Sequence, residues 1–166
     1  MAVAAPTPLL AAPRPPAAAV GTPQLSVVIV NFAQWKNTAR LTAQLRNCEA
    51  VRRGAAEVVI VDNRSAASRV PGKLRRLSGV SVVRNPRNHG FARAVNRGGR
   101  LSRGEWVLLL NPDVTVPPGF LDAVLDAAQR WPAVDPTAGV VGFQLRNPDG
   151  TRQASAGPFP TLLSSV

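Results

Sequence analysis

The 166-residue chain has no tyrosine, a single cysteine, a single histidine and only two lysines. With Cys48 as its only cysteine, neither an intrachain disulfide nor a cysteine-ligated zinc site can form. We interpret Cys48 as a small buried apolar residue. No uninterrupted apolar run approaches the ~18 residues of a transmembrane helix. The cysteine count therefore excludes the disulfide-stapled and zinc-finger classes of small protein.

Acidic residues are also scarce. The chain holds 9 of them against 20 lysines and arginines, which gives a formal net charge of +11. Within residues 84–103, six arginines occur without one acid. This excess predicts attraction to polyanions, namely nucleotide phosphates, nucleic acid or anionic lipid.

The first 24 residues are rich in alanine and proline and lack the basic start of a signal peptide. We expect a disordered leader over residues 1–24 and one domain over residues 25–166, which is long enough for a core. We also expect a cytoplasmic protein. Its basic charge is compatible with a peripheral position at the inner face of the cell membrane.

From residue 25 onward, short apolar runs alternate with helical patterns. Five strands are predicted, over residues 25–30, 57–61, 80–83, 106–110 and 139–145, followed by a turn over 147–150. Helical stretches with one apolar face lie between them, and Phe91 and Trp106 fit core positions. Such alternation predicts an α/β fold: a mostly parallel, Rossmann-like sheet with helices on both faces.

Polar residues follow each of the first four predicted strands, at 31–32, 62–63, 84–86 and 111–113. In an open parallel sheet, ligands bind beyond the carboxyl ends of the strands. Asp62 suits a nucleobase or ribose acceptor, or a strand-end cap. Asp113 suits Mg²⁺ or Mn²⁺ bridging two phosphates, or a turn, and the same Asn-Pro-Asp tripeptide recurs at 147–149.

A predicted helix begins near His89 and Gly90, at the same edge of the sheet as Asp62 and Asp113. Free backbone N–H groups at a helix start, together with nearby arginines, suit a diphosphate. A lone histidine beside a glycine is more typical of a turn or cap than of a catalytic group. This segment therefore predicts an anion site rather than a general base.

In order and spacing, four blocks resemble the family-2 glycosyltransferases: LSVVIVNF, VVIVDNRS, NPRNHGFARAVNRG and WVLLLNPDVTVPPGFL. More narrowly, they resemble the bacterial rhamnosyltransferase-like branch, as does the tail VGFQLRNPDGTRQASAGPFPT. The resemblance covers roughly residues 25–162. It implies a GT-A fold, a nucleotide-diphospho-sugar donor (UDP- or dTDP-linked), a divalent metal and inversion at the anomeric carbon.

Carried over onto this sequence, the resemblance implies a set of nucleotide-sugar-binding residues: Asn31, Phe32, Asp62, Asn63, Asn88, Gly90, Arg93, Asn96 and Asn111. It implies Mg²⁺ or Mn²⁺ binding at Asp113. Asn111 replaces the first carboxylate of the family's Asp-x-Asp motif, as is usual in this branch. With one charge fewer, we expect weaker metal binding.

The family's chains are longer than this one, and their catalytic base lies in an acidic motif that would fall beyond Val166. An inverting transfer needs such a carboxylate to accept the proton of the acceptor hydroxyl. We therefore expect this chain to be the donor-binding half only, with a glycan or lipid-linked acceptor bound elsewhere. The sequence leaves open whether that half acts in an enzyme or is an inactive nucleotide-sugar-binding fragment.

A nucleic-acid-binding module is the alternative from another class, because the arginine-rich surface would suit phosphates. Such a module needs aromatic side chains that stack on bases. Aromatic residues make up only 5% of the chain, and we expect no nucleic-acid partner.

Overall fold

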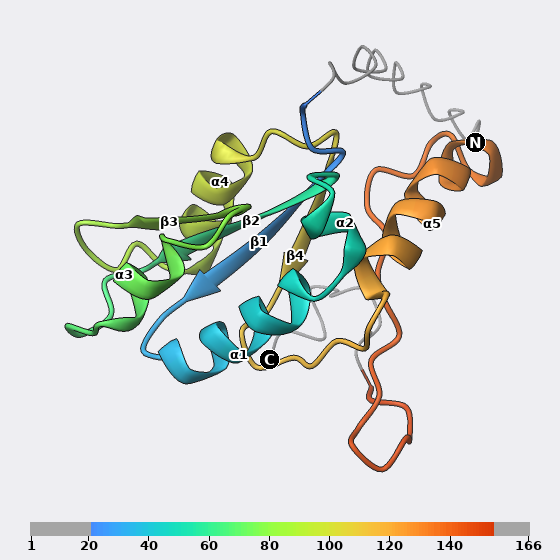
Figure 1. Ribbon diagram of the computed structural model, residues 1–166. Helices are drawn as coiled ribbons and strands as arrows, with labels where there is room; N and C mark the ends of the chain where they lie inside the picture. The colour runs from blue at the N-terminus through green and yellow to red at the C-terminus, as the bar shows by residue number, and fades with distance from the viewer. Residues whose placement is uncertain (1–20, 155–166) are drawn as a thin grey trace, which may run out of the picture.

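The β-branched runs form the centre of a four-stranded parallel sheet in a computed structural model that describes residues 21–154 (Figure 1). The strands are β1 (Leu25–Asn31), β2 (Ala56–Asp62), β3 (Val80–Arg84) and β4 (Trp106–Leu110), in the order β3-β2-β1-β4. All seven residues of β1 and of β2 are buried. The unbroken apolar runs of the two central strands reflect cover on both faces.

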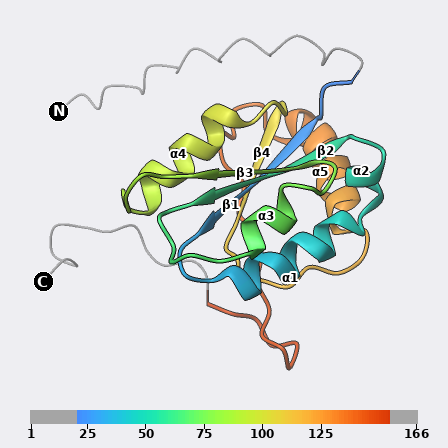
Figure 2. The same cartoon turned by 60° about the vertical axis from the view of Figure 1, so that its left-hand side comes forward.

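Five helices connect or follow these strands: α1 (Trp35–Arg46), α2 (Glu49–Arg52), α3 (Val70–Leu74), α4 (Phe91–Leu101) and α5 (Phe120–Val134). α4 lies on one face of the sheet, and α1, α2, α3 and α5 lie on the other (Figure 2). The predicted α/β fold with helices on both faces is confirmed. The larger core cluster lies under the four helices, where Leu41, Leu45, Leu121 and Leu125 pack against the sheet.

α4 approaches the sheet unusually closely at Gly98, which is buried. A Cβ atom at this position would lie 2.4 Å from Cγ1 of Val28 on β1. No side chain larger than hydrogen therefore fits without movement of the helix or the strand. This contact sets how near α4 lies to the central strands.

A polar cluster closes the amino-terminal end of the sheet. The Glu57 carboxylate accepts hydrogen bonds from Ser26 Oγ (2.8 Å), from the Arg103 backbone N–H (2.9 Å) and from the Arg103 guanidinium (2.6 and 2.9 Å). Burial raises the pKa of Glu57, but the hydrogen bonds from Arg103 and Ser26 outweigh it, so that the pKa lies below its ordinary value of 4.5. The cluster ties the turn between α4 and β4 to the two central strands.

The predicted fifth strand, over residues 139–145, is wrong. In this segment Val140 is 93% exposed, and no partner strand pairs with it among residues 21–154. A strand needs a neighbour for its backbone hydrogen bonds, and an apolar run alone supplies none. The turn at 147–150 is present, and it joins Arg146 and Arg152 in an isolated antiparallel bridge.

β4 is also less buried than its aliphatic sequence suggests. It is the edge strand beside β1, and its Val107 and Leu109 side chains are 53% and 40% exposed. Cys48 is buried as predicted, and it lies between the end of α1 and the start of α2.

Most of the predicted leader, residues 1–20, lies outside the described residues, as do residues 155–166. Residues 21–24 lead directly into β1, and the Gln24 backbone N–H donates to the Ala55 carbonyl oxygen (2.8 Å). Within residues 21–154, no helix has the length and apolar character needed to cross a membrane.

Candidate functional site

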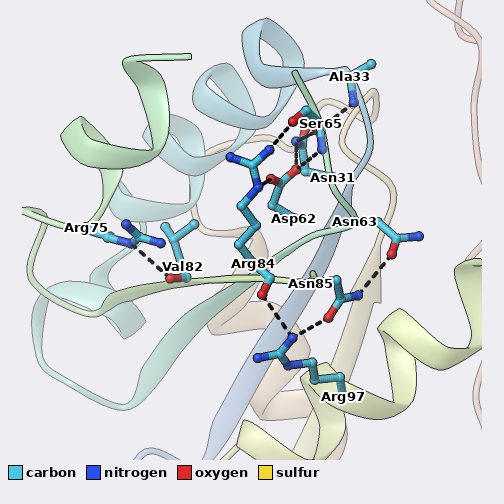
Figure 3. A network of polar contacts seen from close by, with 10 residues as sticks. All are labelled: Asn31, Ala33, Asp62, Asn63, Ser65, Arg75, Val82, Arg84, Asn85 and Arg97. Atoms are coloured by element: carbon cyan, nitrogen blue, oxygen red, sulfur yellow. Dashed lines mark hydrogen bonds and ion pairs between the residues drawn. The ribbon is translucent and has the colours of Figure 1, made fainter. Parts of the chain in front are cut away.

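Sheet register aligns three polar residues at the carboxyl ends of the strands. Asn31 at the end of β1 is paired with Asp62 on β2, and Asp62 is paired with Arg84 on β3. The Arg84 Nε atom lies 3.3 Å from Asp62 Oδ2, as Figure 3 shows. Because the last residues of β1, β2 and β3 are in register, their polar side chains form a row across the three strands.

Asn31 and Asp62 are held within the protein rather than exposed. Asn31 Nδ2 donates to Asp62 Oδ1 (3.0 Å) and to Ser65 Oγ (2.9 Å), while Asn31 Oδ1 accepts from Thr38 Oγ1 (2.8 Å). Asp62 Oδ1 also accepts from the Ser65 backbone N–H (3.2 Å). Burial of these groups is offset by hydrogen bonds on both oxygens of the carboxylate, counting its ion pair with Arg84.

Asn63 joins β2 to the loop that precedes α4. Its Nδ2 donates to Asn88 Oδ1 (2.6 Å) and to the Gly90 carbonyl oxygen (3.2 Å). Its Oδ1 accepts from Asn85 Nδ2 (3.0 Å) and from the His89 backbone N–H (3.1 Å). Both donors and both lone pairs of this carboxamide are therefore used. In this arrangement Asn63 orders the β3–α4 loop and has no hydrogen-bonding capacity left over.

The start of α4 presents backbone N–H groups that no side chain caps. Gly90 occupies the N-cap position with φ +80° and ψ +168°, a backbone conformation that glycine adopts without strain. The first N–H groups of a helix have no partners within it, and they carry the positive end of its dipole. Arg97 reinforces the loop from α4 by donating to the Arg84 carbonyl oxygen (3.1 Å) and to Asn85 Oδ1.

Asp113 lies in the loop after β4, and its exposed carboxylate makes no hydrogen bond or ion pair with the residues that the structure describes. Arg40 on α1 holds the backbone of this loop, since its Nη2 donates to the carbonyl oxygens of Asp113 (2.9 Å) and Val114 (3.2 Å). Asn111, also exposed, precedes it by two residues. The loop thus offers one unpaired carboxylate on a tethered backbone.

These elements enclose a cleft of about 330 Å³ at the carboxyl ends of the strands. Its lining residues are Val30, Phe32, Gln34, Asn63, Asn88, Gly90, Phe91, Asn111, Pro112 and Asp113. Six of the residues singled out in the sequence therefore line one cleft: Phe32, Asn63, Asn88, Gly90, Asn111 and Asp113. Four do not: Asn31 and Asp62 are buried beside it, and Arg93 and Asn96 lie exposed on α4.

Sequence reasoning missed several residues of the site. Phe91 is 54% exposed and lines the cleft, so its predicted core position is wrong. It is the first residue of α4, and the helix packs against the sheet only from Ala94 onward. The sequence did not identify Gln34 and Arg40 as site residues. Gln34 resembles an ordinary polar residue at a helix start, and Arg40 resembles an ordinary exposed residue on a helix face.

The residues suit a divalent cation only in part. Among residues 21–154, no group of three or more histidine, cysteine, aspartate or glutamate side chains could hold a metal ion. Asp113, with the Asn111 amide nearby, instead fits the pattern in which Mg²⁺ or Mn²⁺ takes one carboxylate and completes its shell with substrate phosphates and water. The chemistry of this donor set is thus compatible with a metal that arrives together with a phosphorylated ligand.

Comparison with known proteins places the chain in a family. Residues 26–161 match the profile of Glycosyl transferase family 2. The chain is 32% identical over 153 residues to the N-acetylglucosaminyl-diphospho-decaprenol L-rhamnosyltransferase of Mycobacterium tuberculosis, covering 86% of this chain and 48% of that protein. It is 30% identical over 111 residues to an uncharacterized glycosyltransferase of Haemophilus influenzae, which covers 67% of this chain and 36% of that protein. The chain thus spans about half the length, or less, of these relatives.

Solved structures share the fold. The mannosyltransferase PcManGT from Pyrobaculum calidifontis, in complex with GDP-Man and Mn²⁺, superposes with a TM-score of 0.61 at 25% identity, over 86% of this chain and 40% of that one. S. aureus TarS in complex with UDP-GlcNAc gives a TM-score of 0.58 at 22% identity, over 65% of this chain and 32% of that one. The sheet is therefore of the Rossmann-like GT-A type, and the chain belongs to glycosyl transferase family 2.

Proposed function

We propose that this chain forms the donor-binding part of an inverting glycosyltransferase that uses a nucleotide-diphospho-sugar. The observation that carries the proposal is the cleft itself, which has the unpaired Asp113 carboxylate in one wall and the uncapped start of α4 in another. A diphosphate needs positive and hydrogen-bond-donating surroundings, and a helix start supplies both. The nucleotide is UDP or dTDP in this proposal, and the sugar is rhamnose, as the name of the mycobacterial relative suggests.

The exposed aromatic rings of Phe32 and Phe91 give the cleft its apolar surface. Flat faces of this kind suit a nucleobase or the apolar face of a sugar ring. Asn31 and Asp62 act in this proposal as buried supports for the β1 and β2 ends, ready to exchange an internal hydrogen bond for one to the base. Arg93 and Asn96 lie on α4 beyond the cleft and join the donor site from its rim.

Asp113, with Asn111, would hold Mg²⁺ or Mn²⁺ together with the diphosphate. When bound, such a cation supplies neutralisation of the charge that develops on the leaving nucleoside diphosphate. The chain's own contribution is to hold the carboxylate in place. Arg40 does this by fixing the backbone carbonyl oxygens of Asp113 and Val114.

The proton of the acceptor hydroxyl needs a base from another part of the protein. Four acids follow Asp113 in the described chain: Asp122, Asp126, Asp135 and Asp149. None of them lines the cleft. Asp135 and Asp149 are turn residues, and hydrogen bonds from Thr137 and Thr151 lower the pKa of each. In this proposal the base, and a lipid-linked or glycan acceptor, belong to a region beyond the described residues.

Thermal denaturation with nucleoside diphosphates tests the donor site. UDP or dTDP with Mn²⁺, at about 100 times Kd, would stabilise the fold by roughly 2.7 kcal/mol. For a domain of this size that raises Tm by roughly 5–10 °C. We expect Asp113→Ala to abolish the part of the shift that depends on metal, and Asp126→Ala, an exposed acid on α5, to leave it unchanged.

A well-folded sample whose Tm responds to no nucleotide, with or without metal, would overturn the proposal. Equal loss in the Asp113 and Asp126 variants would remove Asp113 from the metal site. Comparing dTDP-rhamnose with UDP- and GDP-linked sugars in the same assay then ranks the donors.

A further inference from the structure

Acidic residues are absent from one continuous quarter of the chain. Between Asp62 and Glu105 the sequence contains no acid but eleven of the chain's twenty lysines and arginines. This segment, residues 63–104, includes α3, β3 and α4. The remaining basic residues share the rest of the chain with all nine acids. The charge of the protein is therefore concentrated in consecutive elements rather than spread evenly.

Those elements gather along one edge of the sheet. β3 is the edge strand beside β2; α3 contacts β3 from one face, and α4 covers β1 and β2 on the other face (Figures 1 and 2). Arg75, which follows α3, donates from Nε to the Val82 carbonyl oxygen of β3 (3.1 Å). Arg97 on α4 donates to the Arg84 carbonyl oxygen, also on β3 (3.1 Å). A cation that follows α3 and a cation of α4 are thus both bonded to the same edge strand.

Only some of the eleven cations have partners. Arg84 and Arg103 pair with Asp62 and Glu57, which flank the segment or lie outside it, and Arg75 and Arg97 bond backbone or amide oxygens. The other seven are exposed and make no side-chain hydrogen bond or ion pair with any described residue: Arg64, Arg69, Lys73, Arg76, Arg87, Arg93 and Arg100. We call these seven residues the basic edge.

The spacing of the arginines on α4 shows which way its basic face points. Arg93, Arg97 and Arg100 lie at i, i+4 and i+7, so they share one face of the helix. Arg97 of that face contacts the end of β3, so the face is directed to the β3 side and away from β4. Arg87, in the loop before α4, continues the basic edge toward the cleft.

Seven unpaired cations around a sheet edge exceed what one nucleotide can neutralise, and they fit an extended anionic surface. Binding of single-stranded nucleic acid would also require aromatic side chains for base stacking. The segment contains only one aromatic residue, Phe91, which lines the cleft. A bilayer with anionic headgroups needs charge alone and no stacking platform.

We propose that the basic edge docks the protein on the surface of an anionic lipid bilayer. This inference rests on the proposed function in one respect: a lipid-linked acceptor would be reached at such a surface. Docking through the basic edge would keep the cleft near the headgroups. Arg87 of the basic edge adjoins Asn88, which lines the cleft, and α4, which carries Arg93 and Arg100, begins at the cleft. The attraction is electrostatic and weakens as salt is added.

Sedimentation with vesicles tests the docking on the full chain, without nucleotide or acceptor. We expect binding to phosphatidylcholine vesicles that contain phosphatidylglycerol, little binding to phosphatidylcholine alone, and loss of binding as salt is raised. In the edge variant, Lys73→Gln, Arg76→Gln and Arg100→Gln remove three cations of the basic edge. Its matched control carries Lys36→Gln, Arg130→Gln and Arg152→Gln, three exposed cations outside the edge.

Each cation near an anionic surface contributes about a fivefold change in partitioning. We therefore expect the edge variant to bind about 100-fold more weakly and the control, with the same net charge, no more than about fivefold more weakly. Equal loss in both variants would overturn the proposal, because net charge alone would then explain the binding. So would undiminished binding to phosphatidylcholine alone.

A single-stranded RNA oligonucleotide provides the competing partner. If the unsubstituted chain prefers RNA to phosphatidylglycerol vesicles at the same salt, and the edge variant loses that binding, the surface is a nucleic-acid site and the lipid proposal is wrong. The vesicles carry no sugar acceptor, so this result is independent of the nucleotide-dependent Tm shift that tests the donor site.

Discussion

The polar side chains around the cleft are of two kinds: those whose hydrogen-bonding groups are bonded within the protein, and those whose groups remain free to bind a ligand. Asn31 and Asp62 are buried and bonded to one another, and all four hydrogen-bonding sites of Asn63 are occupied. Asp113, by contrast, is exposed and unpaired within the described chain. Supporting residues of this kind fix the geometry of a site, whereas open ones bind its ligand.

Replacing Asn63 by alanine would remove the four hydrogen bonds that its side chain makes to Asn85, Asn88, His89 and Gly90. We expect a loss of roughly 2–3 kcal/mol of stability, since each lost bond costs about 1 kcal/mol and Asn85, one of the four partners, is buried. Amide hydrogen exchange should accelerate across residues 85–91 before the rest of the chain. Chemical denaturation and exchange measurements together check both effects.

Asn63→Asp sharpens this test. The aspartate keeps the acceptor oxygen but places a carboxylate against Asn88 Oδ1 and the Gly90 carbonyl oxygen, so we expect it to destabilise at neutral pH at least as much as alanine. Asn37→Ala, which removes a hydrogen bond from a half-exposed asparagine on α1, should change stability by less than about 0.5 kcal/mol. Equal effects at both positions would contradict the role given to Asn63.

Single residues were predictable where they follow strands and unpredictable where they act across the chain. Asp113 and Asn63 could be placed from sequence because each comes within three residues of the end of an apolar run. Arg40 could not, because its contact with the Asp113 carbonyl spans 73 positions and an exposed arginine on a helix looks ordinary. Phe91 was misplaced because helical periodicity identifies an apolar face but not where along the helix that face leaves the sheet.

At the scale of elements, apolar runs predicted four strands well and a fifth wrongly. The four have parallel neighbours with continuous register, so their apolar side chains and backbone groups are both satisfied. The run over residues 139–145 is also largely apolar, although it includes Gly139, Gly142 and Gln144, and it has no partner among the described residues. The composition of a segment indicates whether it can be buried. Whether it pairs as a strand depends on residues elsewhere in the chain, which its own composition does not show.

Glu57 links the elements at the opposite end of the sheet, and its lowered pKa makes this link dependent on pH. In the folded state the carboxylate binds its proton less readily than in the unfolded chain. Its stabilisation is therefore complete above the ordinary value of 4.5 and is lost as the pH falls through the lowered folded-state pKa. We expect Glu57→Gln to cost roughly 2 kcal/mol near neutral pH, discounted for the exposed Arg103 guanidinium.

Urea denaturation across pH measures this contribution. The stability difference between the unsubstituted chain and Glu57→Gln should be full near neutral pH and should shrink as the pH falls below the ordinary value of 4.5. Glu49→Gln, which breaks an exposed ion pair with Arg52, should cost less than about 0.5 kcal/mol. A difference for Glu57→Gln that stays constant with pH would show that packing, not charge, stabilises this end of the sheet.

For the whole molecule, the two edges of the sheet differ. The β3 edge is lined by cations, while β4 has no outer partner among residues 21–154 and exposes Val107 and Leu109. An open edge with apolar side chains favours self-association. We expect a concentration-dependent dimer in light scattering, weakened at least about tenfold when Val107 and Leu109 are both replaced by lysine, because their half-exposed surfaces no longer contribute apolar burial.

Leu101→Lys is the matched control, since Leu101 is 44% exposed but lies on α4 rather than on a strand edge. It should leave the dimer unchanged. A chain that stays monomeric at every concentration, or a dimer that survives the β4 substitutions, would show that this edge does not mediate association.

Arg75 makes the two edges of the sheet unequal as places for an added strand. By donating to the outward carbonyl oxygen of Val82, it occupies an acceptor that an incoming strand on the β3 side would need. A strand added on the β3 side would have to displace this contact, whereas the outer edge of β4 has no partner among residues 21–154. Two copies that meet through β4 would have their β3 strands as outer edges, where the Arg75 contact disfavours pairing with a third chain.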